Sequence, residues 1–239
     1  MTPRLYRFER VDSTMDVLHA LAEAGAEPGT AVLASEQLQG RGSRGRAWHS
    51  PPGGLWLSVL FRPPVGGGVE IISLRAGLAV AQGLDGLLRE PIRLKWPNDL
   101  MLGDRKTGGI LGEARWQGPV LGWVAVGVGL NVQNGVPLEV RESATWLALD
   151  HPGLTPDVVA GPVLAALRQL DLGPAELAGW ELKQFARRDW LQGRELRAPV
   201  SGTAAGITPE GALRVRRPDG ETGTVRSGSV ELAPVPSAR

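Results

Sequence analysis

The sequence contains no cysteine, a single tyrosine, and no apolar run long enough to cross a bilayer. Without cysteine, a disulfide framework and a thiol nucleophile are both excluded. The first ten residues carry charges where a secretory signal needs an apolar core, so we expect a cytoplasmic protein without membrane attachment. The formal net charge of +1 gives no general attraction to nucleic acid, and clustered arginines therefore need a local explanation.

Lysine is also scarce in this chain. Of the 26 basic residues three are lysines, at positions 95, 106 and 183, and the first two share one short stretch. In a chain so biased toward arginine, a retained lysine indicates a place where a compact ammonium does what a planar guanidinium cannot. Two lysines can also lie close together by chance when the chain has only three. The clustering therefore supports a functional interpretation but is not sufficient evidence for it.

The densest pattern is the segment SEQLQGRGSRGRAWH at residues 35–49. Glycines at 40, 42 and 45 let the backbone bend and bring its N–H groups close to a ligand. Arginines at 41, 44 and 46 provide planar donors that suit phosphate or carboxylate. The pattern predicts a loop that binds a small anionic ligand, with a solvated turn as the alternative.

Three known loop types do not fit this segment. The spacing Gly40-x-Gly42-x-x-Gly45 matches a dinucleotide fingerprint, but prolines and glycines follow at 51–54 where a helix should begin. A Walker loop needs lysine and serine or threonine where Arg46 and Ala47 stand. RNA-binding arginine–glycine segments occur as longer repeats in disordered tails, whereas this one is single and lies between expected strands.

The hydrophobic and polar patterns predict alternating strands and helices up to about residue 192. Ser13 and Asp16 form a helix-capping pattern, and Ser13 as a simple cap is the alternative to a functional role. We expect strands at 5–9, 30–35, 55–61, 93–96, 110–116 and 119–130, with a hairpin turn at 103–104, and helices at 14–24, 71–88, 155–170 and 174–191. Residues 193–239 change to five short runs of strand-forming residues between glycine-rich turns, which predict a small β-barrel.

Four features occur together in chain order: Ser13-Thr14 at a helix start, the loop Gln37–Trp48, the stretch Lys95–Gly109, and Gly127–Asn131. In this order they resemble biotin protein ligase over about residues 5–232. The most specific pieces are Gly-Arg-Gly-x-x-Gly-Arg-x-Trp, Lys-Trp-Pro-Asn-Asp and Lys-x-x-Gly-Ile-Leu. The resemblance implies an α+β fold, with a mixed β-sheet catalytic domain flanked by helices (1–192) and a small SH3-like β-barrel domain (193–239).

The resemblance also implies a two-step reaction. The carboxylate of biotin attacks the α-phosphate of ATP, with Mg²⁺ expected, to give biotinyl-5′-AMP and pyrophosphate. A lysine of a biotin carboxyl carrier domain then takes the biotinyl group. Neutralising a carboxylate and a triphosphate is work for arginines, backbone N–H groups, a lysine and a metal ion, so the lack of cysteine is no obstacle.

Position by position, the resemblance assigns biotin contacts and nucleotide contacts. Lys106 and Arg41 are the expected catalytic residues, with Lys106 donating to the reacting carboxylate; a solvated hairpin lysine is the alternative. The expected biotin-binding residues are Ser13, Thr14, Gln37, Gly40, Arg41, Gly42, Lys106 and Gly109. The expected ATP- and adenylate-binding residues are Arg41, Arg44, Arg46, Trp48, Lys95, Asn98 and Asn131. Asp99 is the expected acid to assist a metal or the acceptor lysine, while the metal ligands stay unassigned.

The sequence departs from the family pattern at two positions. Ser43 stands where many members have arginine, and Met15 where asparagine is often found, so the affinity for the adenylate is expected to differ. We expect no DNA-binding domain, a homodimer remains open, and segment 40–48 is expected to be mobile until ligand binds. Lipoate ligase, which shares the fold and the adenylation chemistry, is the alternative enzyme, and a non-catalytic nucleic-acid-binding protein is the alternative from another class.

Overall fold

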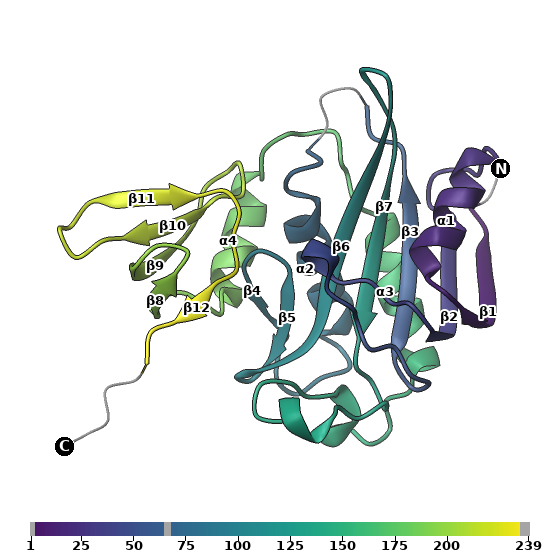
Figure 1. Cartoon of the computed structure of the whole chain (residues 1–239), viewed down its shortest axis with the longest axis horizontal. Coiled ribbons are helices and arrows are strands. Elements are labelled where there is room, and N and C mark those ends of the chain that lie inside the picture. Colours follow the sequence, from purple (N-terminus) through teal and green to yellow (C-terminus); the bar gives the residue numbers. More distant parts are fainter. Residues whose placement is uncertain (1–2, 65–67, 235–239) are drawn as a thin grey trace.

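The computed structural model describes residues 3–64 and 68–234, and its larger part is a seven-stranded sheet in the order β1-β2-β3-β7-β6-β5-β4 (Figure 1). Strands β1 and β2 are parallel, and the other neighbours are antiparallel, so the predicted mixed sheet is confirmed. The strands are β1 (Leu5–Val11), β2 (Ala31–Gln37), β3 (Leu55–Phe61), β4 (Arg93–Lys95), β5 (Asp99–Leu102), β6 (Arg105–Gln117) and β7 (Val120–Leu130).

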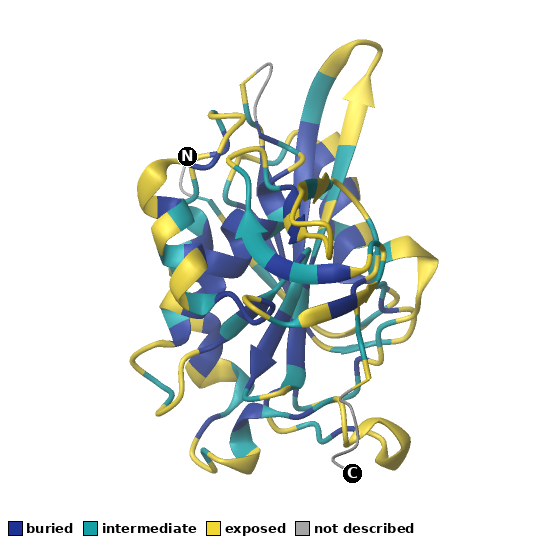
Figure 2. Ribbon diagram, turned by 90° about the vertical axis from the view of Figure 1, so that its left-hand side faces the viewer, coloured by how far each residue is buried: buried dark blue, intermediate teal, exposed yellow. Residues whose placement is uncertain are grey.

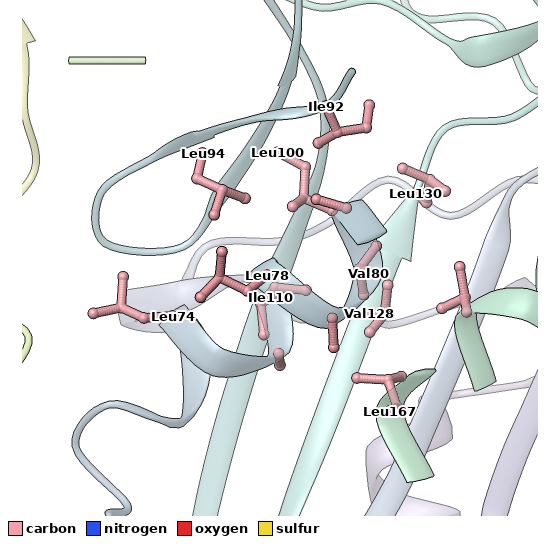
Figure 3. Packing of buried hydrophobic residues seen from close by; sticks show 14 of the residues in the cluster. Leu74, Leu78, Val80, Ile92, Leu94, Leu100, Ile110, Val128, Leu130 and Leu167 are labelled. Atoms are coloured by element: carbon pink, nitrogen blue, oxygen red, sulfur yellow. The ribbon is translucent and has the colours of Figure 1, made fainter. Parts of the chain in front are cut away.

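Helices cover both faces of this sheet. Helix α1 (Thr14–Glu23) packs on one face, and α2 (Ile72–Leu84) with α3 (Pro156–Arg168) on the other. Side chains alternate between the two faces as a β-strand requires, since Val126 joins the α2–α3 core and Ala125 the α1 core. Figure 3 shows α2, β6, β7 and α3 meeting in the larger core, and Figure 2 shows burial concentrated in the sheet and the inner sides of the helices.

Two predicted helices are shorter in the structure. Helix α2 ends at Leu84, not at 88, and α4 covers Gly179–Arg188, not 174–191. The carbonyl groups of Pro174 and Glu176 leave the helical path because each accepts a hydrogen bond, both of 2.6 Å, from the buried Arg75 guanidinium. Glu181, which pairs with Arg75, also accepts from the Ala178 N–H at 2.8 Å and so fixes the helix start.

The expected C-terminal unit is a five-stranded antiparallel sheet in the order β11-β10-β9-β8-β12. Its strands are β8 (Glu195–Ala198), β9 (Gly202–Ile207), β10 (Leu213–Arg216), β11 (Thr222–Val225) and β12 (Glu231–Leu232). Within the described residues the strand pairs run as an open series from β11 to β12. The sheet lies beside α4 and β4 (Figure 1).

The two sheets share one apolar core. Leu213 and Val230 of the C-terminal unit belong to the same buried cluster as α2 and α3. The indole N–H of Trp96 donates to Gly211 O at 2.8 Å, which ties the short Lys-Trp-Pro-Asn-Asp stretch to the second sheet. The boundary at residue 192 therefore stays a prediction. Among the described residues, no helix is both long and apolar enough to cross a membrane.

Candidate active site

Glycines create a hollow on the α1 face of the sheet. In the register of β6 and β7, Gly109 lies opposite Gly129, and Gly127 is on the same face two residues earlier. No side chain fills the pleat at these positions, so the sheet surface is recessed. A Cβ at Gly127 would lie 3.0 Å from Met15 Sδ, and one at Gly129 would lie 2.6 Å from Trp48 Nε1. The glycines thus let α1 and Trp48 approach the sheet closely.

This hollow, the first cavity, has a volume of about 180 Å³ and a polar end at the start of α1. Ser13 caps the helix, accepting from the Met15 N–H at 3.3 Å, and it also lines the cavity. The N–H and hydroxyl of Thr14 donate to Gln37 Oε1 at 2.8 and 3.0 Å. The cavity therefore combines apolar walls with fixed polar groups at one end, as binding sites for small organic molecules do.

The arginine–glycine segment (residues 40–48) folds over the first cavity. Its two ends meet where the Trp48 N–H donates to Gly40 O at 2.8 Å. Between them Ser43–Gly45 forms a tight 3₁₀ turn in which Arg44 has a φ of 62°. Left-handed backbone of this kind is unfavourable for a residue with a side chain, so the turn is strained. The expected loop thus contains a tight, strained turn.

Lys106 stands near the edge of the first cavity. Its Nζ lies 2.5 Å from Asp99 Oδ1 and 5.1 Å from the centre of the Trp48 ring. Its main chain is held in place, because its N–H donates to Ser143 O and its carbonyl accepts from the Thr145 N–H, both at 2.8 Å. The ammonium is therefore fixed by a carboxylate, an aromatic ring and a paired backbone.

A third cavity, of about 410 Å³, lies on the other side of Lys106 and Trp48. Its walls are partly apolar, with Val136 and Trp190 among them, and Asn131 lies at its base. Asn131 is buried, and its amide is engaged with Thr145 O at 3.1 Å and with the Asn134 amide at 3.0 Å. Lys106 and Trp48 line both the first and the third cavity, so these two side chains mark their junction.

A second cavity, of about 290 Å³, lies between segment 40–48 and loops of the C-terminal unit that include Gly211 and Ser229. Its basic side chains are Arg44, Arg46, Lys95 and Arg226. Arg44 also donates to Ser229 Oγ at 2.8 Å and so connects the segment to the second sheet. Arg46 borders the first cavity as well, and Lys95 the third. The three cavities are therefore neighbours around one cationic region.

Burial changes the ionisation of one of these cations. Burial lowers the pKa of Lys95, while the nearby Asp99 carboxylate opposes the shift. The ammonium also lies 5.5 Å from the centre of the Trp190 ring. An anion bound in the second or third cavity would favour the charged form of Lys95.

Two family models match the chain. Residues 7–131 match the biotin/lipoate A/B protein ligase family, and residues 194–233 match the biotin protein ligase C terminal domain. The bifunctional ligase/repressor BirA of Bacillus subtilis is 30% identical over 245 residues, covering 97% of this chain and 75% of that protein. The biotin--[acetyl-CoA-carboxylase] ligase of Paracoccus denitrificans is 35% identical over 236 residues, covering 88% and 93%. The chain belongs to the biotin protein ligase family.

Solved structures of biotin protein ligases have the same fold. The Aquifex aeolicus enzyme in complex with biotin and ATP is 26% identical, with a TM-score of 0.78 over 97% of this chain and 99% of that one. The Leishmania major ligase in complex with biotinyl-5-AMP is 25% identical, with a TM-score of 0.64 over 94% and 99%. The predicted family and fold class are therefore confirmed.

Most of the residues that the resemblance to biotin protein ligase assigned to biotin surround the first cavity. These lining residues are Ser13, Thr14, Gln37, Arg41, Gly42, Lys106 and Gly109. Gly40, the first residue of the segment, is not among the lining residues, and a Cβ there would come within 2.4 Å of both Ser50 Oγ and Trp48 O. Its place shows a need for close backbone packing. The ligand contacts themselves stay predictions.

The residues assigned to the nucleotide are distributed over all three cavities. Trp48, Lys95 and Asn131 line the third cavity, Arg44 and Arg46 the second, and Arg41 the first. Asn98 borders the first and second cavities, and its amide donates to Ile110 O at 2.7 Å. The structure therefore brings these residues to one region without placing them in a single pocket.

Several lining residues carry no motif. Trp190 comes from the connection between α4 and the C-terminal sheet, and Val136 from the loop after β7. Nothing local in the sequence indicates that these segments return to the third cavity. The alternating glycines of β7, in contrast, are a visible signal, because small residues on one face of a strand predict a close approach or a hollow.

Proposed function

We propose that this chain activates biotin with ATP and transfers it to a lysine of a biotin carrier domain. The observation that carries the proposal is the position of Lys106, whose ammonium lies at the junction of the first and third cavities. A carboxylate in the first cavity and an α-phosphate reached from the third would meet beside this ammonium. Two negatively charged reactants need a fixed cation at the point where they join.

In the first step a carboxylate oxygen of biotin forms a bond to the α-phosphorus of ATP, and the bond from that phosphorus to the bridging oxygen breaks. Pyrophosphate leaves with the bond electrons. Lys106 donates a hydrogen bond to the carboxylate, and the basic side chains of the second cavity, including Arg46 and Lys95, offset the charge of the phosphates.

In the second step the amine of the carrier lysine attacks the acyl carbon of the adenylate. An amide bond forms, the acyl–oxygen bond breaks, and AMP leaves with the electron pair. Lys106 again donates to the acyl carbonyl as negative charge develops on it. Asp99, which pairs with Lys106, is the carboxylate that we assign as the general base, and it receives the proton released by the amine.

Magnesium is part of this proposal as the ion that accompanies ATP. Mg²⁺ is usually held by one or two carboxylates together with substrate phosphates. Within residues 3–64 and 68–234, no group of three or more His, Cys, Asp or Glu side chains gathers as a ligand set. The Asp99 carboxylate, which borders the second and third cavities, suits this ion and would hold it when ATP is bound. The metal would neutralise charge on the leaving pyrophosphate.

The test is exchange of labelled pyrophosphate into ATP by the purified protein with magnesium. We expect exchange that depends on biotin, and transfer of biotin to a carrier domain in a second assay. Exchange that depends on lipoate would assign the chain to lipoate activation, and exchange with neither acid would refute adenylation. The same proposal places the protein in the cytoplasm and assigns it no DNA-binding activity. Whether it forms a homodimer is measured by size-exclusion chromatography with light scattering.

A further inference from the structure

Arg41, which lines the first cavity, makes its contacts with two carboxylates outside that cavity. Its Nε lies 3.3 Å from Glu113 Oε1, and its Nη2 lies 3.4 Å from Glu113 Oε2. Its Nη1 lies 2.5 Å from Asp16 Oδ1. The guanidinium therefore joins segment 40–48 to two other elements, the first turn of α1 and strand β6.

The two carboxylates differ in exposure. The Asp16 side chain is 55% exposed, so water and salt weaken its attraction to Arg41. The Glu113 side chain is 21% exposed and is the better shielded partner. Glu113 lies on the same face of β6 as Gly109 but four residues further along, beyond the first cavity. It is thus positioned to hold Arg41 without touching a ligand.

A buried histidine fixes the Glu113 carboxylate. His19 of α1 is 8% exposed, and its Nε2 lies 2.9 Å from Glu113 Oε2. Its Nδ1 accepts a hydrogen bond of 2.9 Å from the indole N–H of Trp123 on β7. Because an indole N–H can only donate, Nδ1 carries no proton and Nε2 carries one. The histidine therefore donates to Glu113, and α1 and β7 together hold this carboxylate in one orientation.

We propose that Glu113 is a positioning residue of the biotin site, acting through Arg41 to hold segment 40–48 over the first cavity, with His19 and Trp123 fixing its carboxylate. The inference rests on the proposed function, since it assigns the first cavity to biotin. Without the Glu113 charge, the strained segment opens more often and biotin binds less tightly. The chemical step at Lys106 is unaffected once biotin is bound.

The primary variant is Glu113→Gln, which keeps the size of the side chain and removes its charge. We expect the KM for biotin in pyrophosphate exchange to rise about tenfold, the order expected for loss of one charge-assisted contact, with kcat changed less than twofold. Glu36→Gln is the matched control. Glu36 is 25% exposed and pairs with Arg10 at 2.6 Å on β1 and β2, and it lines none of the three cavities.

A double-mutant cycle separates positioning from a general structural role. In an Arg41→Ala background, Glu113→Gln should add almost nothing to the KM for biotin, because its route to the site is already removed. Additive effects would overturn the inference. So would a folded Glu113→Gln enzyme with the KM of the wild type.

A second variant covers failure of Glu113→Gln to fold. Trp123→Phe keeps an aromatic side chain of smaller size and removes the N–H that fixes His19, and we expect a smaller rise of the KM for biotin in the same direction. A folded Trp123→Phe enzyme with an unchanged KM overturns the inference in that case. If the wild-type protein shows no biotin-dependent exchange, the proposed function itself fails, and this outcome is distinct from an active wild type with unaffected variants.

Discussion

At the scale of single residues, the site depends on side chains whose charge is fixed by a specific partner. Lys106 is held by Asp99 and by the face of Trp48. Glu113 is held by His19 and paired with Arg41. Each of these two side chains contributes to activity and to the free energy of unfolding. Substitutions measured in both assays distinguish the two contributions.

Replacing Lys106 should abolish activity without unfolding the protein. Lys106→Ala loses the cation at the junction of the two cavities, and we expect biotin-dependent exchange to fall by about a hundredfold or more. The free energy of unfolding should change by about 1 kcal/mol or less, because the side chain is 30% exposed and its ion pair is partly screened. Pyrophosphate exchange and thermal unfolding measure the two effects, and Lys183→Ala, at an exposed position of α4, is the control. Normal exchange by Lys106→Ala would contradict its role.

Glu113 should make stability depend on pH. The hydrogen bond from His19, together with attraction to Arg41, holds the pKa of Glu113 below its ordinary value. A carboxyl whose pKa is lower in the folded state stabilises the protein above its unfolded pKa, and this contribution is lost as the pH falls through the folded pKa. The wild type should therefore exceed Glu113→Gln in stability by on the order of 1 kcal/mol near pH 7, with the difference shrinking below about pH 5.

Urea unfolding of both proteins from pH 7 to pH 3 measures this difference directly. Titrating groups that do not contact Glu113 are common to the two proteins, so their contributions cancel, and the difference reports on Glu113 together with its partner His19. A difference that stays constant over the whole range would contradict the assigned shift.

At the scale of elements, the site is a junction of strands and one strained segment. Strands β6 and β7 supply a rigid floor, since each is paired on both sides. Segment 40–48 carries Arg44 in a left-handed conformation and is held mainly by contacts of its side chains with Asp16, Glu113 and Ser229. The floor is therefore expected to be stable and the cover to open locally.

Hydrogen exchange should reveal this contrast. Amides of residues 40–48 should exchange quickly in the free protein and slow down when biotin and ATP are added, because the bound anions offset the repulsion among the arginines. Amides of β7 at 124–130 should be protected in both states and serve as the internal control. Exchange at 40–48 that is unaffected by the ligands would refute the ordering.

At the scale of the whole molecule, two sheets share a core, and Gly211 lies at their contact. Its φ is +79°, and a Cβ there would lie 2.7 Å from Ile71 Cγ2 and 2.8 Å from Leu74 Cδ1 of the catalytic part. Its carbonyl accepts from the Trp96 indole. The position needs glycine both for its backbone conformation and for close packing.

Gly211→Ala should destabilise the protein by about 2–4 kcal/mol, the sum of backbone strain and overpacking. Gly220→Ala is the matched control. The φ of Gly220 is also positive, at +88°, but a Cβ added there would meet no atom within 4 Å. The control should lose about 1–2 kcal/mol from backbone strain alone. Chemical denaturation measures the free energy of unfolding of both variants. Equal losses would show that a Cβ at Gly211 is accommodated without overpacking between the two sheets.

The sequence by itself determined the family and the fold class, and it singled out seven of the residues that line the first cavity. The arginine–glycine segment, Lys-Trp-Pro-Asn-Asp and Lys-x-x-Gly-Ile-Leu are local patterns, and the hydrophobic periodicity is a local property as well. Helix ends were less predictable. The segment before α4 avoids a helix because a buried arginine far away in the sequence captures its carbonyl groups.

Only the tertiary structure decided how the site is assembled. The junction of two cavities at Lys106 and Trp48 exists because β6, β7 and segment 40–48 meet, and no single segment encodes that meeting. Trp190 reaches the third cavity from the connection between the two sheets, and His19 reaches Glu113 across 94 residues of sequence. Local patterns specify elements and their chemistry, whereas packing of distant elements specifies which charges face one another.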